Sequence, residues 1–351
     1  MRGLSTRPAF IGLCTAFIGV AYLARTEHQL GSAFHNDFDM QLMAARMLLS
    51  GQNPYALIGP HRAFDYPWHL YYPAPTLVLF AALAWFPVWL ARSIFVAATC
   101  FALSFALAAT RQPWWRYLVF VSACAQSAVL LGQTSLLFAA MWLLPVFGLV
   151  AAIKPNVAAA IAAARLRWRW LIPPIIGGSL LVGLSFAIAP HWLGWWLGEL
   201  TVDPTRSMAV ARPWGMLLLL AGLKWRRAEA RLLLCLSVVP QTLGPYDGVL
   251  LFFIPSSAAQ SIALVALSHF VFVVSFGLKP ASLTDAVIQN GISVVHLLYL
   301  PALAMVLVRR NEGAAPAWLE RRLARFPDWL RGDAGTSVEP FDPDFAGPLA
   351  E

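Results

Sequence analysis

The chain has 351 residues, of which 59% are hydrophobic and 12% are charged, and its mean hydropathy is +0.66. Soluble domains carry about a quarter charged residues, so the composition excludes an ordinary soluble globular protein and indicates a chain that crosses a membrane repeatedly. The net charge of +8 comes from short basic clusters between apolar stretches, the pattern of the positive-inside rule. We therefore expect membrane lipids, and no nucleic acid, as its surroundings.

The first apolar stretch, residues 8–24, is expected to be an uncleaved signal anchor, because Cys14-Thr15-Ala16 is a poor cleavage site. Residues 25–71 then form a long polar connection, the first loop outside the membrane. Within this loop, apolar side chains recur at helical spacing over residues 38–49. They predict an amphipathic helix that lies at the membrane interface and is ended by the Gly and Pro residues of 50–55.

The rest of the chain predicts an all-α, polytopic integral membrane protein with about 10–12 transmembrane helices. Further crossings are expected at residues 72–89, 93–110, 117–131, 135–164, 171–190, 215–223, 232–243, 249–257, 262–278 and 287–308. Residues 135–164 should hold two short or broken crossings, because Pro145, Lys154 and Pro155 interrupt them and such breaks are tolerated where they line an enclosed cavity. Residues 1–308 form the predicted transmembrane domain, and 309–351 a polar cytoplasmic tail.

Charge then predicts the topology. With the N-terminus inside and an even number of crossings, most basic clusters face the cytoplasm: Arg92, residues 165–169, residues 224–231 and Arg309-Arg310. Arg111 and Arg116 are exceptions that face outward. The loop that contains Asp37 and the turn at Tyr246-Asp247 both fall outside. We thus expect a multi-pass protein of the cell membrane, with both termini cytoplasmic and a site on the extracytoplasmic face.

Asp37 and Asp39 stand out because acidic residues are scarce: eight of the 17 lie from Glu312 onward. Asp37 could cap the N-terminus of the predicted helix. It could instead be a general base at the membrane surface, where partial desolvation would raise its pKa toward a useful range. The two carboxylates could also hold a divalent cation through their oxygens, although two ligands are few.

Other polar residues within apolar sequence have two interpretations each. Lys154 is a functional candidate because a Lys inside a span is costly, but it could also extend from a helix end to the membrane surface. Gln133 could bind a polar ligand or satisfy a helix terminus, and Asp247 could be a plain turn residue. The aromatic residues of 64–73 could form an interfacial belt or a platform for sugars. The four cysteines are isolated and give no metal-binding spacing.

The sequence has no glycine-rich phosphate loop and no nucleotide-binding half domain. A donor carried by a soluble nucleotide would usually need such a domain, whereas a lipid-carried donor would not.

Asn36-Asp37-Phe38, followed by Ala44-Ala45-Arg46 and Gly51-Gln52-Asn53-Pro54-Tyr55, resembles the opening signature of the glycosyltransferase family 87 membrane proteins. Shorter pieces follow in the family's order: Tyr66-Pro67, Tyr72-Pro73-Ala74-Pro75, Phe86-Pro87, Gly132-Gln133, Lys154-Pro155 and Pro245-Tyr246-Asp247. The resemblance covers about residues 37–255. It implies a GT-C fold and an inverting transferase that uses a polyprenyl-phosphate sugar as its lipid-linked donor substrate.

The resemblance implies that Asp37 is the general base, with Asp39 as a second acid, and that Lys154 and Gln133 hold the lipid phosphate. The remaining substrate-binding candidates are Arg46, Tyr55, Tyr66, His69, Tyr246 and Asp247. Two departures concern the acceptor and the sugar: Gln133 and Lys154 are closer in sequence than two full spans, and Tyr246-Asp247 stands where some members have a His.

The resemblance further implies transfer of a sugar, with mannose expected, to an envelope glycolipid or glycan acceptor. One rival is a transporter or flippase of lipid-linked sugar precursors, which predicts inverted repeats and charges near the midplane. The other is a non-catalytic membrane protein that binds glycolipid.

Overall fold

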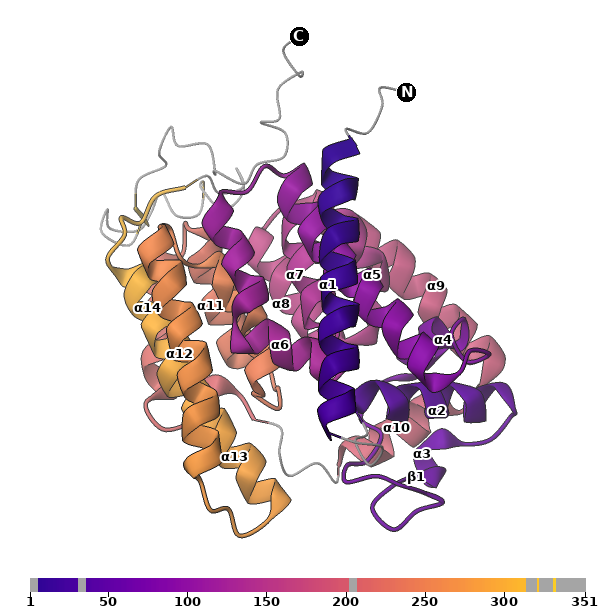
Figure 1. Cartoon of the computed structure of the whole chain (residues 1–351). Coiled ribbons are helices and arrows are strands. Elements are labelled where there is room, and N and C mark those ends of the chain that lie inside the picture. The colour runs from indigo at the N-terminus through magenta and orange to yellow at the C-terminus, as the bar shows by residue number, and fades with distance from the viewer. Residues whose placement is uncertain (1–5, 31–35, 202–206, 314–320, 322–330, 333–351) are drawn as a thin grey trace. The chain divides into compact units, whose positions relative to one another are not determined.

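The computed structural model describes residues 6–30, 36–201, 207–313, 321, 331 and 332. Its described elements are almost all helices, as the all-α prediction requires (Figure 1). The two strands within these ranges are β1 (Ile58–Gly59) and β2 (Phe64–Asp65), which pair in parallel with Ile58 opposite Phe64. Most of the predicted tail, from residue 314 onward, lies outside the described residues.

The chain divides into two compact units. The first contains residues 1–108, 125–158 and 171–205, and the second contains residues 109–124, 159–170 and 206–351. The first unit holds α1 (Thr6–Leu30), α2 (Asp37–Leu49), α3 (Pro54–Leu57), α4 (Ala74–Ala81), α5 (Val88–Ala109), α6 (Ala123–Leu130), α7 (Ser135–Leu143), the 3₁₀ helix η2 (Pro145–Ile153), α8 (Pro155–Arg165), α9 (Ile172–Ile188) and α10 (Trp192–Leu200). The last residue of α5, the first two residues of α6 and residues 159–165 of α8 belong to the second unit.

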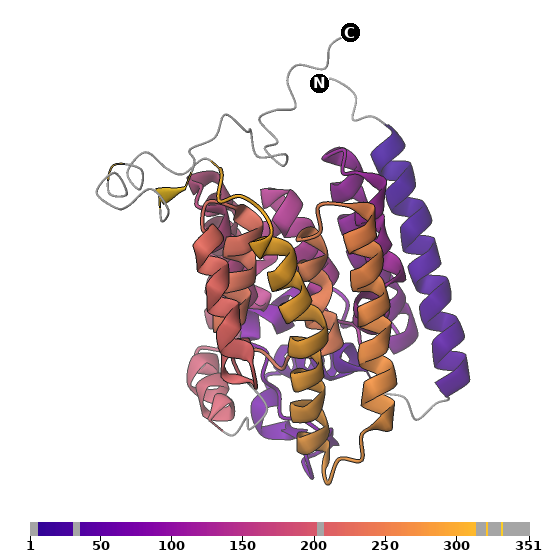
Figure 2. The same ribbon diagram turned by 90° about the vertical axis from the view of Figure 1, so that its left-hand side faces the viewer.

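The second unit contains more 3₁₀ structure. Its elements are the 3₁₀ helices η1 (Trp114–Val121), η3 (Trp168–Trp170), η4 (Ala209–Ala211), η5 (Gly215–Lys224) and η6 (Pro245–Phe253), the α-helices α11 (Ala228–Val238), α12 (Ala258–Gly277), α13 (Leu283–Val294) and α14 (Leu300–Leu307), and the π-helical segment η7 (Val295–Tyr299). Helices α13 and α14 join through η7 into one long helix (Figure 2).

Helix α2 forms because both of its ends have local signals. Asn36 is the N-cap: its side chain accepts a hydrogen bond from the backbone N–H of Asp39, and the Asp39 carboxylate accepts one from the backbone N–H of Asn36, both at 3.2 Å. This reciprocal pair is a capping box. Gly51, with φ +74°, follows the last turn in the left-handed conformation that glycine tolerates best. The helix therefore spans almost the predicted range.

The predicted surface position of α2 is wrong. Asp39 and Gln41 are buried along with most apolar residues of the helix, and Leu49, at 43% exposure, is the only exposed residue of α2. The aromatic rings of Phe38, Phe80 and Phe95 pack together with centroids 4.9–5.3 Å apart. They join α2, α4 and α5, so the first turn of α2 belongs to the core of the first unit.

Helix α1 packs against α5 through two glycines. A Cβ on Gly12 would lie 2.6 Å from the Phe101 ring, and one on Gly19 would lie 2.7 Å from the Cys100 sulfur. Small residues let helices approach closely in this way. The opposite surface of α1 exposes large apolar side chains such as Phe17.

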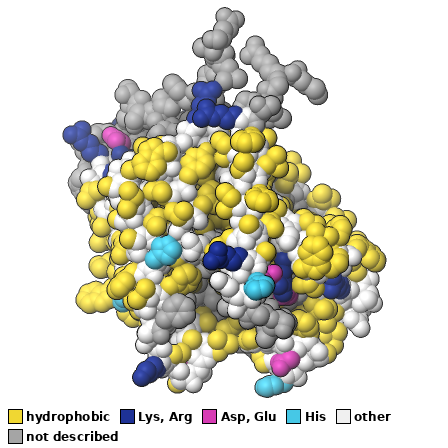
Figure 3. Space-filling model, viewed as in Figure 1, with side chains coloured by type: hydrophobic (Ala, Val, Ile, Leu, Met, Phe, Trp, Pro, Cys, Tyr) yellow, Lys and Arg dark blue, Asp and Glu magenta, His cyan; other side chains and the backbone are white. Residues whose placement is uncertain are grey.

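Five of the described helices are long and apolar enough to cross a membrane: Arg7–Gln29, Val88–Ala109, Trp168–Ile188, Ala258–Ser275 and Leu283–Leu307. Hydrophobic side chains cover most of the face in Figure 3. The other predicted crossings fall on shorter helices. Residues 135–164, for example, divide into α7, η2 and α8, which confirms the predicted breaks near Pro145 and Lys154.

Candidate functional site

The carboxylate of Asp37 lies at the first turn of α2, where two side chains donate hydrogen bonds to it. Tyr66 Oη donates to Asp37 Oδ1 at 2.8 Å, and Gln133 Nε2 donates to Asp37 Oδ2. Tyr72 Oη donates in turn to Gln133 Oε1 at 3.3 Å. The structure therefore brings together Asp37, Tyr66 and Gln133 of the predicted site residues. With Tyr72 and Lys154 they form what we call the Asp37 cluster.

Gln133 reaches Asp37 because of the turn that precedes it. Gly132 ends α6 with φ +60°, and a Cβ there would lie 2.5 Å from the Cβ of Phe38. Only glycine combines this left-handed conformation with so close an approach. The turn thus lies directly against the start of α2 and holds the buried Gln133 side chain beside the carboxylate.

Lys154 enters the cluster from a break between two helices. It follows η2 and immediately precedes Pro155, the first residue of α8. Thr76 Oγ1 on α4 donates a hydrogen bond to the carbonyl of Ile153 at 2.9 Å, which fixes the residue before the lysine. The half-buried Lys154 then places a positive charge near Asp37.

The electrostatics of Asp37 balance opposing effects. Burial raises the pKa of Asp37, whereas the Tyr66 hydrogen bond, the Lys154 charge and the Gln133 hydrogen bond oppose the rise. The negative charge of Asp39 adds to it. Burial and the nearby Asp37 charge also raise the pKa of Tyr66, so this phenol stays a hydrogen-bond donor. A carboxylate whose pKa is raised in this way is a stronger base than an ordinary aspartate, which is what general-base catalysis requires.

Asp39 has different partners from Asp37. Its Oδ1 accepts a hydrogen bond from Arg92 Nε at 2.5 Å, and its Oδ2 forms an ion pair with Arg92 Nη2. Arg92 Nη1 also contacts Glu27 Oε1 near the end of α1. We call Arg92, Asp39 and Glu27 the Arg92 clamp. The alternative in which Asp37 caps the helix is wrong, because Asn36 is the cap and Asp39 completes the capping box.

The Arg92 clamp also corrects the predicted topology, which put Arg92 and the Asp37 loop on opposite sides of the membrane. A direct ion pair cannot bridge a hydrocarbon core about 30 Å thick, so both lie at the same level. The physical reason is α4: its eight residues extend about 12 Å, too short for a crossing.

Two other predicted residues, Arg46 and Tyr55, bind main-chain carbonyls. Arg46 donates to the carbonyls of Ala84 and Phe86 at 2.9 and 2.7 Å, just after α4. Tyr55 Oη donates to the carbonyl of Tyr72 at 2.9 Å, which supports the segment that carries the Tyr72 ring. These contacts give Arg46 and Tyr55 structural partners, and the structure does not bring them onto the Asp37 carboxylate.

His69 belongs to a second ionic group that the sequence did not suggest. Its Nδ1 lies 2.7 Å from Glu199 Oε2, and Arg62 Nη1 donates to Glu199 Oε1 at 3.0 Å. Glu199 is on α10, so this trio ties α10 to the loop between α2 and α4. In the sequence, the signal for this group was the single acidic residue of the Trp-rich segment 192–200. The corresponding signals for the Arg92 clamp were the charges of Glu27 and Arg92.

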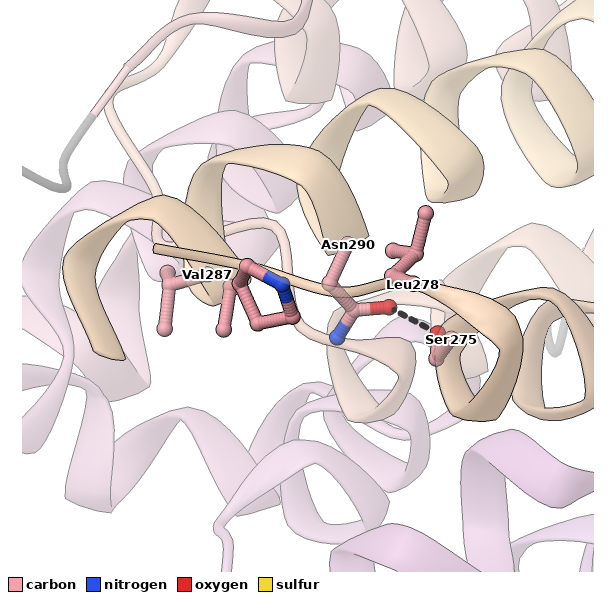
Figure 4. A pocket seen from close by; sticks show the side chains of 6 residues that line it. Ser275, Leu278, Val287 and Asn290 are labelled. Atoms are coloured by element: carbon pink, nitrogen blue, oxygen red, sulfur yellow. Dashed lines mark hydrogen bonds between the residues drawn. The ribbon is translucent and has the colours of Figure 1, made fainter. Parts of the chain in front are cut away.

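Tyr246 and Asp247 belong to the second unit. Asp247 Oδ2 accepts a hydrogen bond from the backbone N–H of Gly244 at 3.2 Å, at the start of η6. The buried Asp247 thus has the turn role considered from the sequence. The second unit also has a cavity of about 190 Å³ at the turn between α12 and α13, where Ser275 Oγ donates to Asn290 Oδ1 at 2.8 Å (Figure 4).

Within the described residues, no group of three or more His, Cys, Asp or Glu side chains is placed to hold a metal ion. Asp37 and Asp39 do not fit a shared cation, because both oxygens of Asp39 face the guanidinium of Arg92. Comparison with protein-family models, with curated proteins and with solved structures finds no match for this chain.

Proposed function

We propose that the chain is a multi-pass membrane glycosyltransferase. It moves a sugar, with mannose expected, from a polyprenyl-phosphate donor to a hydroxyl of an envelope glycolipid or glycan. The observation that carries this proposal is the geometry around the Asp37 carboxylate. Tyr66 and Gln133 orient it by hydrogen bonds, and the positive charge of Lys154 acts on it. The likeness of the segments around these residues to glycosyltransferase family 87 supports the same assignment.

The proposed reaction is an inverting displacement. The acceptor oxygen attacks the anomeric carbon, the bond from that carbon to the phosphate oxygen breaks, and the lipid phosphate leaves with the electron pair. Asp37 takes the proton of the attacking hydroxyl. The hydrogen bonds from Tyr66 and Gln133 hold the carboxylate in one orientation, which is the positioning that such a step needs.

Lys154 supports the leaving-group half of the reaction. The phosphate carries the negative charge that develops as its bond to the sugar breaks, and a fixed cation stabilises such charge in a water-poor site. Lys154 is held by the neighbouring Thr76 bond and by Pro155 rather than by a flexible loop. A phosphate already bound to a lipid needs no nucleotide-binding fold.

The membrane setting fits a lipid-carried substrate. Five helices have the length and apolarity of membrane crossings, and α1 and α9 expose large apolar side chains such as Phe17 and Leu180. A polyprenyl chain can therefore stay in the bilayer while its phosphate reaches a polar cluster. The cluster is assembled at the start of α2, beside the aromatic core of the first unit.

The test is sugar transfer by the full-length protein in nanodiscs, supplied with a radiolabelled polyprenyl-phosphate mannose and membrane glycolipid as acceptor. Asp37→Asn should reduce transfer about 100-fold or more, since it removes the general base. Asp65→Asn is the matched control: Asp65 is an exposed carboxylate in the same loop that accepts a hydrogen bond from the backbone of His61. This control should transfer sugar at the wild-type rate.

Normal transfer by well-folded Asp37→Asn would refute the role of this carboxylate. If the wild-type protein transfers no sugar but moves the labelled lipid between leaflets, the protein is a flippase. If it binds the lipid and does neither, it is a glycolipid-binding protein.

A further inference from the structure

Arg92 joins the ends of three helices beside the Asp37 cluster. It is the fifth residue of α5, and its guanidinium contacts Asp39 on α2 and Glu27 on α1. The side chains of Arg92 and Asp39 are only 12% and 8% exposed. Charges that are this well shielded from water interact strongly, so the loss of one partner has large effects.

We propose that Arg92 is a positioning residue for Asp37, which fixes the first turn of α2 and offsets the charge of Asp39 beside the reactive carboxylate. This inference rests on the role proposed above for Asp37. Arg92 itself has no assigned contact with a substrate, and its effect passes through Asp39.

The positioning step follows a chain of hydrogen bonds. Two nitrogens of the Arg92 guanidinium bind the two oxygens of Asp39, a fork that fixes the plane of the carboxylate. Asp39 Oδ2 accepts a further bond from the backbone N–H of Asn36, and Asn36 Oδ1 accepts one from the N–H of Asp39. Asp37 is the residue directly after Asn36, so the clamp fixes the backbone from which its side chain extends.

The electrostatic step concerns the groups that act on Asp37. These are Tyr66, Lys154 and Gln133, which lower its pKa against the rise caused by burial, and Asp39, which raises it. Among the elements packed on α2, α3 carries Tyr55 and α4 carries no charged side chain. Arg92 supplies the positive charge that offsets Asp39. Without it, the uncompensated charge of Asp39 should raise the pKa of Asp37 further.

The experiment measures the ionisation of Asp37 without relying on catalysis. Infrared spectra of the protein in nanodiscs are recorded against pH, and the carboxyl band that disappears in Asp37→Asn is assigned to Asp37. In Arg92→Gln the midpoint of this band should rise by about one pH unit, because the charge of Asp39, which raises the pKa of Asp37, is no longer offset. Arg25→Gln is the matched control, since Arg25 is an exposed residue of α1 and its loss should leave the midpoint unchanged.

A second variant has the opposite sign. Glu27→Gln removes a negative charge from the clamp, so the Arg92 charge then offsets Asp39 only. The midpoint of the Asp37 band should therefore fall. This variant also carries the test if Arg92→Gln does not fold. In Arg92→Lys, which keeps the charge and loses the fork, the midpoint should stay within a few tenths of a unit of wild type while sugar transfer decreases.

An unchanged midpoint in folded Arg92→Gln, or an unchanged or raised one in Glu27→Gln, would overturn the inference. The two proposals can fail separately. If the wild-type protein transfers no sugar and the infrared shifts are still observed, the proposed function fails and the positioning role of Arg92 stands. If transfer depends on Asp37 and the midpoint ignores Arg92, only the positioning role fails.

Discussion

Replacing Gly132 with alanine tests how tightly the turn between α6 and α7 must lie against α2. The substitution has two effects at once, because Gly132 has φ +60° and because its Cβ would lie 2.5 Å from the Cβ of Phe38. The atom in the way belongs to the base of a buried side chain, so it cannot rotate aside. Either the turn or the first turn of α2 must move.

The two effects have separate magnitudes. A non-glycine residue in the left-handed region costs about 1–2 kcal/mol, and forcing an extra methyl into a packed core costs about 1–3 kcal/mol. Gly132→Ala should therefore lower the free energy of unfolding by about 2–5 kcal/mol. It should also weaken sugar transfer by about tenfold to 100-fold, because a shift of the turn draws Gln133 away from Asp37.

Gly51→Ala separates the two effects. Gly51 has φ +74°, and a Cβ there would meet nothing within 4 Å, so only the conformational cost of about 1–2 kcal/mol applies. Thermal unfolding of both variants in the same detergent, followed by tryptophan fluorescence, gives the comparison. Equal melting temperatures for the two variants would refute the argument that Gly132 is required for close packing against Phe38.

Two further predictions concern the first unit. If Asp37 is the base, transfer should decrease as the pH falls through its raised pKa, and Tyr66→Phe should move this acid limb to higher pH, because it removes a hydrogen bond that favours the ionised form; a pH–rate profile that stays in place would contradict this. Glu199→Gln should weaken the ion pair with Arg62 and the hydrogen bond with His69 and lower the free energy of unfolding by about 1–3 kcal/mol, measured as a lower melting temperature and faster proteolysis at α10. Wild-type stability in this variant would show that the trio does not hold α10.

The helices near Asp37 were predictable because their signals are local. Apolar spacing over 38–49 and the Gly-Gln-Asn-Pro turn after it define α2 to within one residue of its observed start. The apolar run 171–190 likewise corresponds to α9. The break near Lys154 followed from the two prolines around it. In each case the deciding interactions lie within a few residues of one another.

The charge partners were not predictable, because they depend on contacts between distant segments. Arg92 looked like a cytoplasmic marker, since hydropathy reports that residues 72–89 are apolar but not that only eight of them form α4. The same limit hid Glu199, whose partners are more than 100 residues away. Hydropathy also could not show that the polar residues of α2 would be buried together with its apolar ones.

The Arg92 clamp also sets an order of events during synthesis. Asp39 leaves the ribosome 53 residues before Arg92, a delay of about 3–10 seconds at the usual rates of translation. During that interval the carboxylates of Glu27 and Asp39 have no guanidinium to neutralise them, and burying them would be costly. The end of α1 that carries Glu27 and the first turn of α2 should therefore stay hydrated until Arg92 has been synthesised. Helix α5, the last of the three to be synthesised, thus supplies the charge that lets these parts of α1 and α2 come together.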